Sequence, residues 1–108
     1  MKTQTTIRWE KKYFEEDFET EFYPFYRYKF HLPEKKVVKV VVYTDTRSCH
    51  FKGYMKHSEA MKDTVMLSII QFLKNEGYDE FRLNGGILEI PKKINVSRGI
   101  VFTQIKKN

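Results

Sequence analysis

The chain has 108 residues, with 20 Lys and Arg against 14 Asp and Glu, so its formal net charge is +6. This length fits one domain of the usual size, and one cysteine cannot form an internal disulfide. The 41% apolar content excludes general disorder, and no apolar run approaches the roughly 20 residues that span a bilayer.

The first half of the chain predicts strands over residues 5–14, 22–32 and 36–44, because aromatic and β-branched residues recur there with a period of two. In the first of these, Ile7 and Trp9 share one face. Asp45 to Ser48 has the composition of a turn, so a short fourth strand is expected over residues 49–55.

The second strand carries aromatic residues on both faces, and Pro24 within it suggests a sheet edge or the point where the chain enters the sheet. One face alternates aromatic and cationic types: Tyr23, Phe25, Arg27, Lys29 and His31. If exposed, such a row could stack bases while it neutralises phosphates. The competing interpretation is a strand buried on both faces, from which Arg27 and Lys29 reach the surface with their charged ends.

A helix is expected over residues 58–76, since apolar residues recur there at steps of three and four. Ser58 is the expected N-cap and Gly77 the residue that follows the helix. After the helix, the Asn84–Gly86 segment predicts a tight hairpin between residues 81–83 and 87–90, and residues 100–105 predict a last strand.

These elements predict a single α+β domain over residues 1–108. We expect a mostly antiparallel sheet of about six or seven short strands, with the main helix packed on one face. No repeat or linker divides the chain.

The excess positive charge lies in two blocks. Residues 35–56 carry six basic and one acidic side chain, and residues 91–108 carry five basic and no acidic ones, so each block is net +5. If the two blocks adjoin in the fold, they form one basic surface able to attract a polyanion. The basic residues are Lys35, Lys36, Lys39, Arg47, Lys52, Lys56, Lys92, Lys93, Arg98, Lys106 and Lys107.

The leading hypothesis is therefore a non-enzymatic protein that binds DNA or RNA through its phosphate backbone. The residues expected to bind are Lys35, Lys36, Lys39, Arg47, Lys52, Lys92, Lys93, Arg98, Tyr23, Phe25, Arg27 and Lys29. Ser97 and Gly99 beside Arg98 could add backbone N–H groups to a phosphate contact. Lysines on exposed strands also serve solubility alone, which is the competing explanation of the charge.

The second hypothesis is an accessory or inhibitory module that docks on an acidic surface of a larger nucleic-acid enzyme. A lysine- and aromatic-rich, alanine-poor composition is like that of many accessory proteins of phages and mobile elements. No cofactor and no membrane partner is expected. The single cysteine and the lack of a basic start followed by an apolar segment predict a cytoplasmic protein.

The third hypothesis is a metal-independent ribonuclease that uses His31, His50 or His57 with an Arg and a Glu. The spacing of these residues fixes no geometry. A metal site at Cys49, His50 and His57 is not expected, because a second pair of ligands is missing. Cys49 and His50 are adjacent on a strand, so they point to opposite faces and do not predict a nucleophile with its base.

Overall fold

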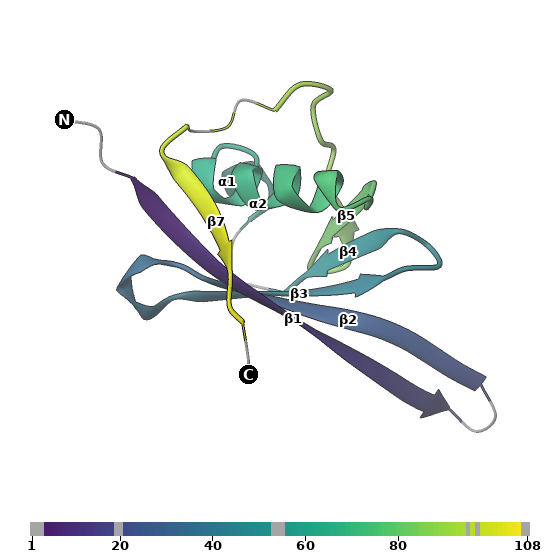
Figure 1. Ribbon diagram of the computed structural model, residues 1–108. Helices are drawn as coiled ribbons and strands as arrows, with labels where there is room; N and C mark the ends of the chain where they lie inside the picture. The colour runs from purple at the N-terminus through teal and green to yellow at the C-terminus, as the bar shows by residue number, and fades with distance from the viewer. Residues whose placement is uncertain (1–3, 19–20, 53–55, 95, 97, 107–108) are drawn as a thin grey trace.

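The computed structural model describes residues 4–18, 21–52, 56–94, 96 and 98–106, which form one sheet with a helical layer on one side (Figure 1). The elements in chain order are β1 (Thr5–Phe18), β2 (Glu21–His31), a 3-10 turn η1 (Pro33–Lys35), β3 (Val37–Tyr43), β4 (Ser48–Phe51), α1 (His57–Ala60), α2 (Thr64–Asn75), β5 (Glu80–Leu83), β6 (Gly86–Ile87) and β7 (Ile100–Gln104). The predicted α+β class is confirmed.

The seven strands have the order β6-β5-β4-β3-β2-β1-β7. Four neighbouring pairs are antiparallel, as expected, but β1 with β7 and β4 with β5 are parallel. A parallel pair needs a long crossover connection. The segment with α1 and α2 makes that connection between β4 and β5, which places the helices against the sheet.

Alternation along each strand directs one set of side chains into a core between the sheet and α2. Tyr28 and Phe30 of β2 are fully buried there, together with Ile69 and Leu73 of α2. The ring of Phe72 on α2 lies 4.9 Å from that of Trp9 on β1 and 4.8 Å from that of Phe102 on β7. The helix is thus held against the strands at the centre and the β7 edge of the sheet. No helix in the described part of the chain is long and apolar enough to cross a membrane.

The helical segment is broken in two, where a single helix over residues 58–76 was expected. The Asp63 carboxylate accepts a hydrogen bond from the Met66 N–H at 2.9 Å and caps α2, so the prediction of Ser58 as N-cap was wrong. A side chain that bonds the backbone in this way favours a helix start over a helix interior. The prediction that Gly77 follows the helix was correct. Its φ is 108°, and the N–H groups of Gly77 and Tyr78 donate to the carbonyls of Lys74 and Leu73, respectively.

Most strand predictions hold, with changes at the ends. β1 runs to Phe18 instead of residue 14, β4 ends at Phe51, and residues 53–55 of the expected fourth strand lie outside the described residues. The expected hairpin is present, because Asn84 and Gly85 have φ values of 52° and 88°, as a tight turn of this type requires. Its second strand, β6, is only two residues long.

The β1–β2 hairpin extends beyond the rest of the sheet (Figure 1). β7 pairs with β1 only from Thr5 to Trp9, and β3 pairs with β2 only from Tyr26 onward. The β1–β2 pairing continues to Phe18 opposite Glu21. We call residues 11–18 and 21–25 the arm. Pro24 lies in the arm past the end of the β3 ladder, so its missing N–H costs the sheet nothing, which agrees with the predicted edge position.

Candidate nucleic-acid interface

The face of the sheet opposite α2 bears no covering element among the described residues, and we call it the open face (Figure 1). Because Tyr28 and Phe30 point into the core, their neighbours Phe25, Arg27, Lys29 and His31 lie on the open face. All four are partly exposed. The alternating aromatic and cationic row predicted on β2 is therefore a surface row at these four positions. Tyr23, the fifth, has a side chain outside the described residues.

Strand register extends this row across the sheet. Residues directly opposite one another on neighbouring strands form lines perpendicular to the strands. One line, which we call the basic line after its three cations, consists of Lys12, Arg27, Val41, His50, Arg82 and Ile87. A second basic pair, Lys29 opposite Lys39, flanks it on one side.

An aromatic line flanks the basic line on its other side. The rings of Phe14 and Phe25 are stacked, with centroids 5.2 Å apart and planes 10° from parallel. Tyr43 follows at 6.0 Å from Phe25, and the imidazole of His50 lies edge-on to Tyr43 at 5.2 Å. Four rings from β1, β2, β3 and β4 thus touch in sequence on the open face, and Phe14, Phe25 and Tyr43 are each partly exposed.

The basic and aromatic lines are in direct contact. The guanidinium carbon of Arg27 lies 4.7 Å from the centroid of the Phe14 ring, and the Lys12 ammonium lies 5.2 Å from it. The Arg27 Nε is buried and has no hydrogen-bond partner within the described part of the chain. A buried donor without an acceptor costs about 1–3 kcal/mol. An anionic ligand that approaches the guanidinium could offset part of this cost.

A hollow of about 390 Å³ lies on β1 and β2 near the end of β7. Its lining combines the cations Lys11, Lys12, Arg27 and Lys29 with Glu10, Gln104 and Ile105. Four positive side chains against one carboxylate make this concave site attractive to phosphate oxygens.

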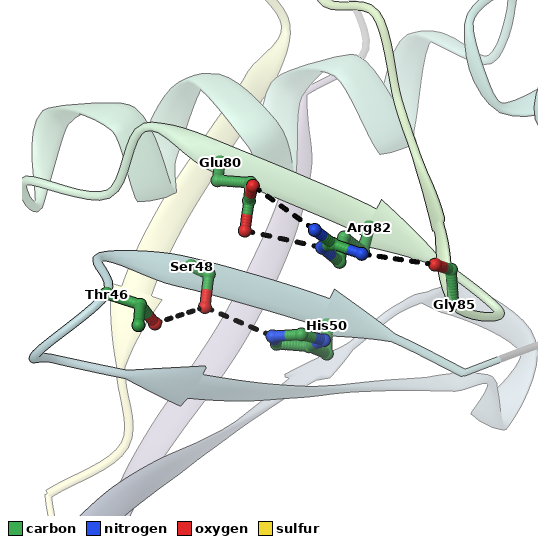
Figure 2. A network of polar contacts seen from close by, with 6 residues as sticks. All are labelled: Thr46, Ser48, His50, Glu80, Arg82 and Gly85. Atoms are coloured by element: carbon green, nitrogen blue, oxygen red, sulfur yellow. Dashed lines mark hydrogen bonds and ion pairs between the residues drawn. The ribbon is translucent and has the colours of Figure 1, made fainter.

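Two polar chains of contacts lie on the open face of β4 and β5 (Figure 2). The Ser48 hydroxyl lies 2.7 Å from that of Thr46 and 3.1 Å from the His50 Nε2. Beside them Arg82 donates to both carboxylate oxygens of Glu80, at 3.3 and 3.4 Å, and to the Gly85 carbonyl at 3.4 Å. Glu80 therefore neutralises Arg82, and the unneutralised charge of the face lies on β1, β2 and β3.

Burial lowers the pKa of His50, and the nearby Arg82 charge lowers it further, while Glu80 raises it. Near neutral pH the imidazole is therefore uncharged. It contributes a ring to the aromatic line and becomes a further cation only in acid.

The two predicted charge blocks contribute residues to different sides of the sheet. Lys39 lies on the open face, whereas Lys92 lines a cavity with Lys74 of α2, on the helical side. Arg47 is exposed and contacts its own chain at the surface, where its guanidinium donates to the Gly77 carbonyl at 2.9 Å and lies 3.6 Å from Asp79. The remaining predicted residues are exposed in connections: Lys35 and Lys36 between β2 and β3, Lys52 after β4, and Lys93 and Arg98 between β6 and β7.

The three residue types considered for catalysis meet at one place on the open face, where His50 lies opposite Arg82 and near Glu80. His31 lies 3.9 Å from Glu10. It lies four residues along the sheet and two strands across from His50, so the two histidines are about 16 Å apart. Burial raises the pKa of the Cys49 thiol, which disfavours its thiolate form. The side chain of His57 is outside the described residues, within which no three His, Cys, Asp or Glu side chains form a group suited to a metal ion.

Sequence reasoning missed Lys12, Phe14, Tyr43 and Arg82 as members of this surface. In each strand the alternation of side chains places the residue on the open face, and this alternation can be seen in the sequence. Their alignment with Phe25 and Arg27 comes from the strand register, which the sequence alone does not provide.

Comparison with known proteins finds no matching family model, no matching curated protein and no matching solved structure.

Proposed function

We propose that the chain is a non-enzymatic protein that binds single-stranded DNA or RNA on its open face. Bases stack on Phe25 and Tyr43, and phosphates lie along Arg27, Lys29 and Lys39. The observation that carries this proposal is the contact between an aromatic line and a basic line on a sheet face without a covering element. Single-strand binders combine stacking platforms with a cationic track for the backbone.

The arrangement favours nucleic acid over an acidic protein surface as the partner. A protein-docking site is expected to gather its exposed apolar residues into a compact patch. The most exposed large apolar side chains among the described residues are Tyr13, Val37, Ile87 and Val96, and they lie on separate elements. The partly exposed aromatic residues on the open face alternate with cations instead.

The test is binding of a fluorescently labelled single strand of about ten nucleotides at low salt, followed by anisotropy. The double variant Arg27→Gln/Lys39→Gln should bind at least about tenfold more weakly than the wild type, because it removes two charge-assisted contacts. The matched control is Lys92→Gln/Lys93→Gln, which removes the same charge away from the open face and should bind nearly as well as the wild type.

A second variant separates stacking from charge. Tyr43→Leu keeps an apolar group of the aromatic line and leaves every cation in place, so it should weaken binding by about 1–3 kcal/mol through the lost ring alone. Lack of binding by the wild-type protein to any single strand at low salt would overturn the proposal. If Arg27→Gln/Lys39→Gln and Lys92→Gln/Lys93→Gln weaken binding equally, binding depends only on the overall charge of the protein.

A further inference from the structure

The edge of β1 that faces β7 is only partly covered. The pairing with β7 spans Thr5 opposite Ile100 to Trp9 opposite Gln104, and the N–H of Ile105 donates to the Trp9 carbonyl at 2.7 Å. Beyond this bond β1 continues to Phe18. Among the described residues, no strand pairs with this edge of β1 along residues 11–18.

The phase of the strand shows which residues face this edge. Thr5 donates its N–H to Gly99, and Trp9 accepts from Ile105, so odd-numbered residues of β1 direct their backbone groups toward β7. By the same alternation Lys11, Glu15 and Asp17 direct theirs to the continuation of that edge. Such a row of backbone groups is a template for another strand. The opposite edge of the arm differs, because Pro24 cannot donate to a partner there.

The sequence of this edge is complementary to itself. Residues 11–17 read KKYFEED, with two lysines at one end and three acids at the other. An antiparallel copy aligned about Phe14 brings Lys11 opposite Asp17 and Lys12 opposite Glu16. Each pairing occurs twice across a two-fold axis, and opposite charges in directly facing positions stabilise a ladder.

We propose that two copies of this chain associate through the β1 edges of their arms, antiparallel along residues 11–17, with Phe14 at the two-fold axis. The molecule as a whole carries +6, which disfavours association with itself. Within the arm, in contrast, the lysines of one copy face the acidic residues of the other. This inference rests on the strand edge and does not depend on the proposed function, although Lys12 and Phe14 also lie on the open face.

Other registers are less favourable. Hydrogen-bonded pairs across this edge must join two odd-numbered residues, so the axis passes through a residue and not between two. An axis at Tyr13 pairs Lys11 with Glu15 but sets Glu10 against Glu16. An axis at Glu15 sets Lys12 against Phe18. Among these three alignments, only the one about Phe14 gives both lysines an acidic partner and brings no like charges together.

The experiment is sedimentation of nuclease-treated protein without nucleic acid, with two charge reversals. Lys11→Glu or Asp17→Lys alone sets like charges against each other at two sites in the dimer. Each should raise the dissociation constant of the dimer by at least about tenfold. An equimolar mixture of the two variants should dimerise again, because Glu at position 11 then faces Lys at position 17 of the other chain. The double variant Lys11→Glu/Asp17→Lys should also dimerise.

The controls address folding and register. The Lys11 ammonium lies 4.2 Å from the centroid of the Tyr26 ring, so each variant is first checked for an unchanged circular dichroism spectrum. The double variant Lys11→Glu/Glu15→Lys, which suits the alignment about Tyr13, should stay monomeric. A wild-type chain that sediments as a monomer at its highest soluble concentration overturns the proposal. So does a mixture of the two single variants that stays monomeric while both are folded.

Discussion

Arg27 illustrates how single residues of the site could and could not be anticipated. Its place in an alternating row with Phe25 and Lys29 follows from the period of the strand alone. Its contact with Phe14, at 4.7 Å, depends on β1 pairing with β2 in one register, with Lys12 opposite Arg27. A shift of one residue would put Phe14 on the core side. Side-chain phase was therefore predictable, whereas the line of rings across four strands was not.

His50 provides a test of the local electrostatics. Its pKa in the folded protein is lowered from 6.5 by burial and by Arg82, so the unfolded chain binds a proton at a higher pH than the folded one. The contribution of His50 to stability is then complete above about pH 6.5 and is lost as the pH falls toward the pKa of the folded state. We expect His50→Gln to lose less unfolding free energy than the wild type between about pH 7.5 and 5.5.

Urea unfolding at the two pH values measures this difference. His31→Gln serves as the control, because His31 lies beside Glu10 on the same face and lacks the neighbouring guanidinium of Arg82. Identical pH dependence in the wild type and His50→Gln would contradict the assignment of the proton to His50.

At the scale of elements, the sequence predicts the strands and helices that have a periodic pattern of apolar residues, but not the bounds that depend on strand pairing or capping. The aromatic and valine-rich strands were placed within a few residues. β1 was predicted too short, because Glu15, Glu16 and Asp17 have low strand propensity and only their ladder with β2 keeps them extended. The helix was predicted too long, because the apolar period continues through Asp63 while its side chain caps α2.

The cap at Asp63 predicts a measurable loss. Asp63→Ala removes the acceptor for the Met66 N–H and should lower the unfolding free energy by about 1 kcal/mol. Asp63→Asn keeps a capping oxygen and should lose clearly less. Both are measured by urea denaturation. Equal losses in the two variants would assign the effect to the negative charge at the helix start instead of the hydrogen bond.

At the scale of the whole molecule, the charge is organised by faces and not by segments. The overall +6 gave only a general attraction to polyanions, and Lys39 and Lys92, one from each sequence block, lie on different sides of the sheet. The open face draws its cations from β1, β2 and β3: Arg8, Lys12, Arg27, Lys29 and Lys39. Lys12 and Arg27 precede both blocks in sequence.

This organisation sets the salt dependence of binding. If the five cations on the open face neutralise phosphates of a single strand, log K should fall against log salt with a slope near about −3.5. A titration of the oligonucleotide at several salt concentrations measures it. A slope twice as steep would show that the lysines and arginines on the helical side also take part.

The parallel pairing of β1 with β7 also decides the order in which the sheet can be completed. Thr5 lies opposite Ile100, so the first strand and its neighbour are separated by nearly the whole described chain. During synthesis β1 and β2 can form their hairpin early, since that contact is local, but the edge meant for β7 stays open until the last strand emerges. The growing chain therefore carries a longer unpaired edge than the finished protein, over the very residues that later close the core with Phe102.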